Sequence, residues 1–403
     1  MKILVINQYY DPDIGASGQI LTSLCESLAS QGIELTVVCG QPSYTEDAVK
    51  APSYEERSNL RIYRVGTAGV KGRVTMRTRV QGYLGFGVTT LFKVISFNRT
   101  EQYDVIMTFS NPPFVGLYGA WFKKKWQAKF LYVLHDLHPD IMIRSGRLRE
   151  GFLTRLWDKI NKYIFNRADQ IVVLSENMKK YLSLQKRVHN DKVIVIPNWS
   201  VETIIPDSRD NTFRKQHGLG TSFLILYAGN MGIMHNLEWL IDSARELQGQ
   251  DILFLFVGSG DKLPLLKSET EKHKLNNVRF LPYQPKEMVN DMLCAADVCV
   301  IALESQAVGL AFPSKTYPIL AGGRPILALA SEGDDLDLLV KNQSCGWSAY
   351  RATDITPILS MLIKSPNLIS EAGKNARTTY EDMFTKQSAV NKFYRVLAAL
   401  TNS

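Results

Sequence analysis

The sequence lacks the features that mark disulfide-rich, metal-binding or membrane-spanning proteins. It has five cysteines in 403 residues, none forms a CxxC pair, and the spacing of Cys294 and Cys299 fits no metal knuckle. The cysteines lie mostly in apolar runs, which indicates small buried hydrophobic residues in a reducing compartment. No stretch reaches the roughly 18 to 20 apolar residues of a membrane span. The N-terminus has neither the apolar length nor the cleavage site of a signal peptide.

A dinucleotide-binding fingerprint is also missing. The turn after the first expected strand reads Gly15-Ala16-Ser17-Gly18 rather than GxGxxG, and the second strand ends at Cys39-Gly40 without an acid for a ribose. These two departures disfavour an NAD site. The turn is either an ordinary loop or a backbone cradle for a phosphate or an acceptor, with Gly15 and Gly18 as the candidate residues.

Positive charge is confined to the first half of the chain. The net charge is +8, and residues 1–205 hold 27 Lys and Arg against 18 Asp and Glu, so the remainder is nearly neutral. Basic residues interleaved with aromatic ones suit an anionic membrane surface, and a solvated basic face without a partner is the alternative. No motif supports a nucleic-acid partner. The clusters are Lys71, Arg73, Arg77 and Arg79, and Lys123, Lys124 and Lys125 beside Trp126.

What the chain does contain is an alternation of strand-like and helix-like segments in two series. This alternation predicts an α/β protein with two doubly wound parallel sheets. We expect an N-terminal domain over 1–205, a C-terminal domain over 206–380, and a last helix within 381–403 that packs back on the first domain. The polar stretch 200–222 has no apolar period and is expected to be the linker between them.

Polar residues follow the end of one expected strand in the first half of the chain. In open parallel sheets, ligands bind outside the carboxyl ends of the strands. His135 and Asp136 follow the apolar run 129–134, and His135 suits a polar contact to a sugar or a proton transfer. A satisfied structural histidine is one alternative, and a metal site formed with Asp136 and His138 is another.

The second half carries two glycine turns and a lysine at a helix start. Glycines let the backbone approach a phosphate, although such turns are common. A lysine in the first turn of a helix opposes the helix dipole unless a phosphate lies between it and the free N–H groups. Ser314 is the expected N-cap of a helix over 314–321, and a merely solvated lysine is the alternative. The candidate phosphate-binding residues are Gly229, Asn230, Gly258, Gly260, Ser314, Lys315 and Tyr317.

The order of these segments resembles that of the family 4 glycosyltransferases, which have the GT-B fold. The resemblance covers nearly the whole chain and is carried by KILVINQYYDPDIGASGQ, HDLHPD, YAGNMG, FVGSGD and PSKTYPILAGGRPILA. In particular, the chain resembles the branch that builds bacterial surface polysaccharides, such as colanic acid and O-antigen. The resemblance implies two Rossmann-like domains facing a cleft. It also implies retaining transfer from a nucleotide-sugar in the second domain to an acceptor in the first, without a metal or other cofactor.

The same resemblance assigns roles to residues and partners. It places His135 near the transferred sugar with Asp136 beside it, and Lys315 at the diphosphate. The expected acceptor is a polyprenyl-diphosphate-linked saccharide, docked by residues 71–99 and 121–126 on an anionic membrane. The protein is therefore expected to be cytoplasmic and peripheral on the inner face of the plasma membrane.

One departure from the family pattern keeps other functions open. Many members carry two glutamates separated by seven residues, and the corresponding positions here are Leu310 and Pro318. Glu304 is the candidate substitute for the ribose contact. The rival hypotheses are a nucleotide-sugar 2-epimerase that uses the 135–140 segment, and a non-catalytic subunit that binds a sugar nucleotide.

Overall fold

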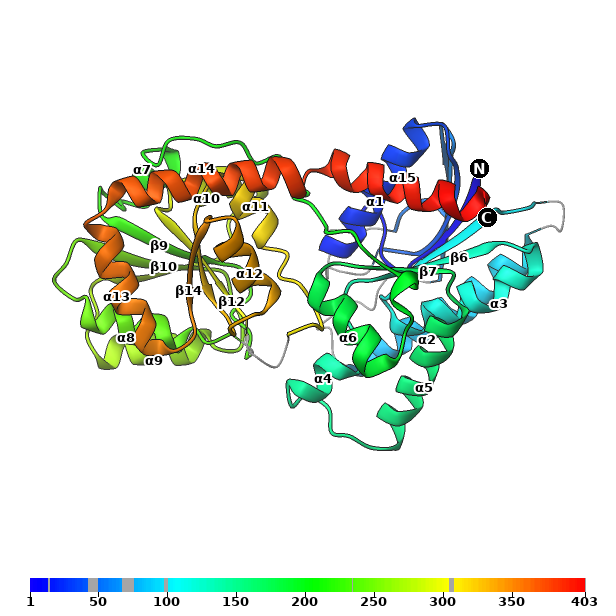
Figure 1. The fold of residues 1–403 in the computed structure, drawn as a ribbon, viewed down its shortest axis with the longest axis horizontal. Helices are drawn as coiled ribbons and strands as arrows, with labels where there is room; N and C mark the ends of the chain where they lie inside the picture. Colours follow the sequence, from blue (N-terminus) through cyan, green and yellow to red (C-terminus); the bar gives the residue numbers. More distant parts are fainter. Residues whose placement is uncertain are drawn as a thin grey trace. The chain divides into compact units, whose positions relative to one another are not determined.

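The chain forms two compact α/β units. The structure is a computed structural model that describes residues 1–13, 15–42, 50–66, 76–97, 101–233, 235–303 and 308–402. Unit 1 comprises Met1–Pro197 and Gln387–Ser403, and unit 2 comprises Asn198–Lys386. Each unit is built on a mostly parallel sheet, which confirms the predicted fold class (Figure 1). The last helix, α15 (Lys386–Asn402), belongs to unit 1 apart from its first residue.

Unit 1 has an eight-stranded sheet in the order β3-β4-β2-β1-β5-β6-β7-β8, in which only the edge strand β3 is antiparallel. The order reverses between β1 and β5, which run parallel to each other, so a ligand-binding crevice is expected at their carboxyl ends. The strands are β1 (Lys2–Ile6), β2 (Glu34–Gly40), β3 (Tyr54–Arg57), β4 (Leu60–Val65), β5 (Val105–Phe109), β6 (Lys129–Leu134), β7 (Gln170–Val173) and β8 (Val193–Val195). The helices before α15 are α1 (Ala16–Ser30), α2 (Met76–Ser96), α3 (Gly116–Trp126), α4 (Asp140–Arg144), α5 (Phe152–Arg167) and α6 (Glu176–Lys186).

Unit 2 has a six-stranded parallel sheet in the order β11-β10-β9-β12-β13-β14. Counted from its first strand, this is the 3-2-1-4-5-6 order of dinucleotide-binding sheets, with the reversal between β9 and β12. The strands are β9 (Phe223–Ala228), β10 (Ile252–Val257), β11 (Val278–Leu281), β12 (Val298–Ala302), β13 (Ile326–Leu329) and β14 (Gly346–Ala349). The helices are α7 (Thr212–Gln216), α8 (Glu238–Glu246), α9 (Leu263–Lys272), α10 (Val289–Ala295), α11 (Thr316–Ala321), α12 (Asp335–Asn342), α13 (Ala352–Ile363) and α14 (Pro366–Met383).

Both faces of the unit 2 sheet are buried, which explains why its strands read as continuous apolar runs. Successive side chains of a strand point to opposite faces. Leu224 and Leu226 of β9 therefore pack in one core with Leu320 of α11. Ile225 and Tyr227 of the same strand pack in the other core. The five cysteines are all free and buried, as the sequence predicts.

The prediction that residues 200–222 form a linker is wrong for most of that stretch. It contains α7, whose Phe213 is fully buried in the core of unit 2. The next residue, Arg214, is buried through polar contacts rather than apolar ones, so composition concealed it. Its Nη2 lies 3.0 Å from Asp297 Oδ2, and its Nε donates to Ala295 O at 2.8 Å.

Replacing Arg214 with methionine is expected to lower the free energy of unfolding by about 3 kcal/mol, because one partner of a buried ion pair is lost. The carbonyls of Ala295 and Gly220 lose their donor as well. Urea unfolding of the full chain measures the change. An exposed arginine on the same unit, Arg351, is the control, because its pair with Asp354 lies at the surface. Equal midpoints for the two variants would contradict the role given to Arg214.

None of the helices in the described part of the chain is long and apolar enough to cross a membrane.

Candidate functional site

Two glycine turns at the carboxyl edge of the unit 2 sheet pack directly on each other. The turn after β9 is tied to the end of β10, because Gly229 N donates to Val257 O at 2.7 Å and Met231 N donates to Ser259 O at 2.8 Å. A Cβ on Gly258 would lie 2.3 Å from Gly229 O, and a Cβ on Gly260 would lie 2.4 Å from Met231 O. Glycine is therefore required at both positions, since no side chain fits between the two backbones.

Lys315 covers the first of these turns. Its Nζ lies 3.9 Å from the centroid of the Tyr227 ring, at the end of β9. A Cβ on Gly229, whose φ is 118°, would lie 2.6 Å from Lys315 Cε. The missing side chain at Gly229 thus provides the space that the lysine occupies. The structure brings together Gly229, Gly258, Gly260 and Lys315, all chosen from the sequence.

The start of α11 differs from the prediction. The helix begins at Thr316, Lys315 is its N-cap residue, and no side chain caps it. Ser314 is exposed, and Thr316 N donates to Pro313 O at 3.1 Å, so a backbone turn performs the role assigned to the serine. The prediction that Ser314 caps a helix over 314–321 is wrong. The lysine nevertheless lies at the helix start, as expected.

Tyr317 lies in the core of unit 2. It is 1% exposed, and its ring centroid lies 5.8 Å from that of Phe312 and 5.4 Å from that of Phe384. Its position two residues after Lys315 suggests a ligand contact, but residues two apart on a helix do not face the same side. The structure therefore gives Tyr317 a packing role beneath α11.

Tyr227 is a residue of this site that the sequence did not predict. Its hydroxyl donates to Asn230 O at 2.6 Å and lies 2.7 Å from His235 Nδ1. The same side chain thus fixes the glycine turn through its hydroxyl and meets Lys315 with its ring face. Asn230 contributes its backbone carbonyl to the hydrogen bond with Tyr227, and the residue itself is exposed. An aromatic residue two positions before the first glycine was the available signal.

Burial lowers the pKa of the Lys315 ammonium to about 7. The sequence predicts a diphosphate at Lys315; such a ligand would favour the charged form and raise that pKa again, so its binding would take up a proton above pH 7. Affinity for a nucleotide-sugar is therefore expected to fall by up to about tenfold per pH unit between pH 7 and 9. Isothermal titration calorimetry in buffers of different ionisation enthalpy measures both the affinity and the number of protons taken up on binding. Lys315→Arg, which stays charged, is expected to show neither effect, and a pH-independent wild-type affinity would contradict this assignment.

In unit 1, His135 and Asp136 lie at the carboxyl end of β6, beside the end of β5. Ser110 Oγ accepts hydrogen bonds from His135 N at 3.1 Å and from Asp136 N at 3.5 Å. The rings of His135 and Phe109 form an edge-to-face contact, with their centroids 5.3 Å apart. Desolvation lowers the pKa of His135 to about 4, so the imidazole is neutral near pH 7. Ser110 was not singled out from the sequence, although it ends a predicted strand.

The remainder of the 135–140 segment is held by structural contacts. Asp140 Oδ1 lies 2.7 Å from Lys186 Nζ and accepts from Tyr181 Oη at 2.8 Å. His138 O accepts a hydrogen bond from Asn161 Nδ2. In the ranges that the structure describes, no three His, Cys, Asp or Glu side chains gather where they could hold a metal ion.

The other candidate turn of unit 1 leads into α1. Gly15 is the N-cap residue of this helix, and no side chain caps it. A Cβ on Gly18 would lie 3.2 Å from Tyr9 Cβ, so Gly18 allows the helix to approach the loop after β1 closely. Arg64 holds that loop from behind, with Nη2 donating to Asp11 O at 2.9 Å. The turn thus has a clear structural use.

The positions of the two family glutamates are filled by residues without a polar side chain. Leu310 is fully buried in the described structure, and Pro318 is part of α11. Glu304, the expected substitute, lies outside the described residues.

Comparisons with known proteins agree over both units. Residues 15–199 match the family described as "Glycosyl transferase 4-like domain", and residues 209–378 match "Glycosyl transferases group 1". The chain is 22% identical over 404 residues to the probable glycosyltransferase WbjE of Pseudomonas aeruginosa, with 97% of this chain and 96% of WbjE covered. It is 26% identical over 344 residues to the putative colanic acid biosynthesis glycosyl transferase WcaI of Escherichia coli K12, with 81% and 83% covered.

The fold is shared with solved structures. Alr3699/HepE of Anabaena, solved in complex with UDP, matches with a TM-score of 0.73 at 16% identity, covering 99% of this chain and 100% of that chain.

Proposed function

The chain belongs to the family 4 glycosyltransferases and has the GT-B fold, and we propose that it transfers a sugar from a nucleoside-diphosphate sugar to a lipid-linked saccharide in bacterial surface-polysaccharide assembly. The observation that carries the proposal is Lys315, a half-buried lysine packed against the glycine turn where the strand order of unit 2 reverses. The similarity to WcaI, a putative colanic acid biosynthesis enzyme, supports the pathway, and the UDP bound to HepE supports a nucleotide ligand.

In this proposal the charge of the leaving diphosphate is held by the protein itself. The Lys315 ammonium lies beside the Gly229 backbone, where the absence of a glycine side chain leaves room for it. A preorganised cation stabilises charge that develops in a transition state, and a low-dielectric site strengthens this effect. We therefore propose that the site binds the diphosphate without a metal. Transfer with retention of configuration follows from the family resemblance.

In unit 1, the proposed roles of His135 and Asp136 concern the sugar and the attacking hydroxyl. A neutral imidazole both donates and accepts hydrogen bonds. Ser110 fixes the backbone at this corner, so the imidazole is positioned by β5 and β6 together. The turn with Gly15 and Gly18 is assigned to the acceptor side.

Two of the three lysines in the 123–125 cluster are engaged in contacts within unit 1. Lys123 Nζ lies 2.7 Å from Asp169 Oδ2. Lys125 Nζ donates to Val94 O at 3.1 Å at the end of α2. Lys124 is exposed. Lys71 and Arg73 lie outside the described residues, as do the side chains of Arg77 and Arg79. Membrane attraction therefore depends on more than this triplet.

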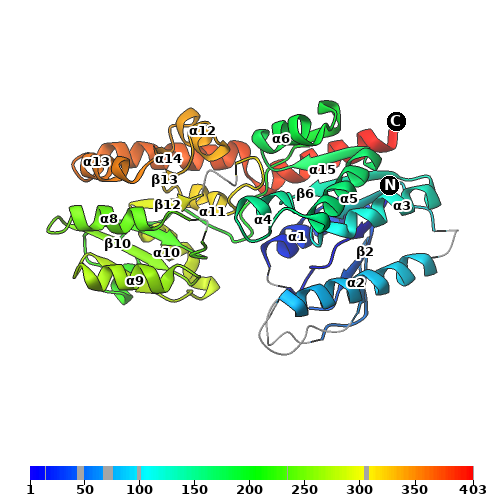
Figure 2. The ribbon, with the colours of Figure 1, turned by 90° about the horizontal axis from the view of Figure 1, so that it is seen from below.

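An exposed apolar row on α2 supports the proposed membrane contact more directly. Leu84, Val88, Phe92 and Ile95 recur at helical spacing and are 63, 55, 67 and 55% exposed. The helix packs on β2 and β4 through its other side (Figure 2). Trp121 on α3 is 48% exposed. Apolar residues on a helix that lies in the membrane interface anchor peripheral proteins.

The double substitution Leu84→Ser and Phe92→Ser is expected to weaken binding to phosphatidylglycerol-rich vesicles more than a hundredfold, since each buried side chain contributes about 1.5 to 3 kcal/mol. Co-sedimentation of the full chain with vesicles measures this. Leu184→Ser, at a 75% exposed position on α6, is the matched control. If the double variant and the control bind equally, α2 is not the membrane contact.

The proposed activity is tested with labelled nucleotide-sugars and a polyprenyl-diphosphate saccharide. We expect the label in the lipid-extractable fraction, and nuclear magnetic resonance of the product gives the anomeric configuration of the new bond. Turnover of the nucleotide-sugar to an epimer without any acceptor would contradict the proposal and favour the epimerase hypothesis.

A further inference from the structure

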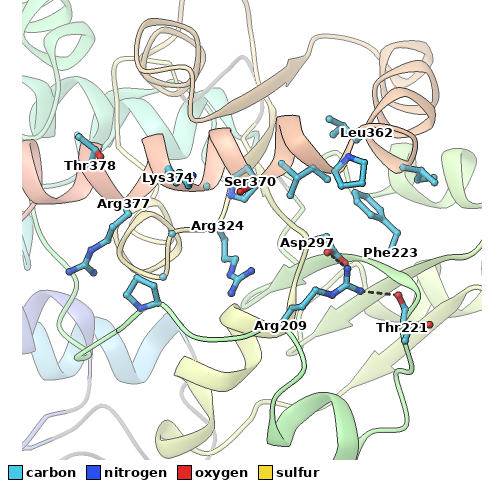
Figure 3. A pocket seen from close by; sticks show the side chains of 18 of the residues that line it. Arg209, Thr221, Phe223, Asp297, Arg324, Leu362, Ser370, Lys374, Arg377 and Thr378 are labelled. Atoms are coloured by element: carbon cyan, nitrogen blue, oxygen red, sulfur yellow. Dashed lines mark hydrogen bonds and ion pairs between the residues drawn. The ribbon is translucent and has the colours of Figure 1, made fainter.

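Unit 2 contains a cavity of about 830 Å³ at the opposite edge of the sheet from Lys315. Its lining includes Phe223 at the start of β9, and Asp297 and Pro325 directly before β12 and β13. The glycine turns and Lys315 instead follow the ends of strands. Helix α14 forms the other wall (Figure 3). The cavity is therefore separate from the site described above, although its volume is that of a small-molecule site.

Positive charge predominates in this cavity. Four cations line it, namely Arg209, Arg324, Lys374 and Arg377, against two carboxylates, Asp251 and Asp297. The charge of Asp297 is already compensated, because its carboxylate lies 2.7 Å from Arg209 Nη1 and 3.0 Å from Arg214 Nη2.

Two of these cations lack a direct ion pair with a described carboxylate, although Arg324 is close enough to Asp297 to lower the pKa of that carboxyl. Within the described ranges, neither Arg324 nor Lys374 forms an ion pair with a carboxylate. Arg324 donates to the carbonyls of Ala296 and Asp207, and its Nε has no hydrogen-bond partner among the described residues. Figure 3 shows the Arg324 side chain below α14, which carries Lys374. An anion between these two groups would compensate both charges.

The remaining wall is apolar. Phe223, Leu362, Pro366 and Ile369 line it. A cavity that combines an apolar wall with a guanidinium and an ammonium fits an organic anion better than a free inorganic ion. Phosphate oxygens match the planar donors of arginine and the point charge of lysine.

We propose that this cavity is a second binding site of the enzyme, which takes a small organic phosphate on Arg324 and Lys374. The site lies at the end of α11 opposite to Lys315. Gly322, Gly323 and Arg324 follow that helix, and Arg377 Nη1 donates to its last carbonyl, Ala321 O, at 2.7 Å. An occupant would thus contact the far end of the element that presents the donor-site lysine. The proposal concerns binding alone and does not depend on the transfer reaction.

The test is calorimetric titration of the full chain with glucose 6-phosphate, fructose 1,6-bisphosphate and uridine 5′-monophosphate, in the Lys315→Met background so that the donor site is weakened. We expect at least one probe to bind with a stoichiometry of one. Lys374→Gln is expected to weaken that binding about tenfold, because one charge-assisted contact is lost. Arg324→Gln is expected to do the same.

Lys374→Gln keeps the test informative even if Arg324→Gln fails to fold, because Lys374 is exposed on α14. Lys267→Gln removes an exposed lysine outside the cavity and is the matched control. Absence of binding by all three probes would overturn the proposal. Binding that Lys374→Gln and Lys267→Gln weaken equally would overturn it as well.

Discussion

Replacing Lys315 with methionine is expected to lower the rate of sugar transfer about 10²- to 10³-fold, the usual cost of losing one preorganised group that stabilises developing charge. Methionine keeps the apolar stem that lies against Tyr227 and Gly229 while the ammonium disappears. The fold is therefore expected to survive, since a lysine with a lowered pKa opposes folding rather than supporting it. Initial rates under saturating donor and acceptor give the change in kcat.

Two further variants show whether a loss of activity in Lys315→Met comes from the missing charge. Lys315→Arg retains the charge and is expected to retain part of the activity, whereas Lys267→Met removes an exposed lysine elsewhere on unit 2 and is expected to be neutral. Full activity of Lys315→Met, with an unchanged melting temperature, would show that the diphosphate is held by other groups.

Replacing Gly258 with alanine is expected to abolish donor binding and to destabilise unit 2. The new Cβ would lie 2.3 Å from Gly229 O, and φ at this position is 130°. Overpacking costs about 1 to 3 kcal/mol, and the positive φ costs roughly 1 to 2 kcal/mol more. Because the carbonyl that must move belongs to the turn beneath Lys315, the geometry of the proposed phosphate site is expected to change as well. Urea unfolding and nucleotide titration measure the two effects.

Gly249→Ala separates backbone strain from overlap. Gly249 has a φ of 95°, but a Cβ there meets no atom within 4 Å. This control is expected to lose a little stability and to bind nucleotide normally. If the two variants bind nucleotide equally well, the contact between the glycine turns does not shape the site.

The main helices and strands, and the glycine turns and lysine of the candidate site in unit 2, could be predicted from the sequence. Apolar runs in β9 and β10, each followed by glycine, mark strands that end in tight turns, and this pattern is local. The lysine at the start of α11 was recognised because it opposes the helix dipole. These signals lie within a few residues of each other along the chain, so they survive without knowledge of tertiary contacts.

The errors arise where a residue's role depends on a distant partner. Arg214 is buried against Asp297, which lies 83 residues away, so the local sequence around it wrongly predicts a linker. The local sequence predicts a free basic cluster at Lys123 and Lys125, yet Lys123 pairs with Asp169 and Lys125 donates to a carbonyl at the end of α2. Tyr227 acts through the neighbouring turn and a lysine far along the chain. Neither the composition nor the hydrophobic periodicity of the sequence predicts which distant residues form these contacts.

The most direct test of a metal-free donor site in unit 2 is a thermal-shift panel of UDP, GDP, ADP and CMP with their sugar conjugates, each measured with and without EDTA. We predict that one nucleoside diphosphate raises the melting temperature equally in both conditions, and that Lys315→Met abolishes the shift. A shift that requires a divalent metal, or one that Lys315→Met leaves intact, would contradict the assignment of the donor site to Lys315 and the glycine turns.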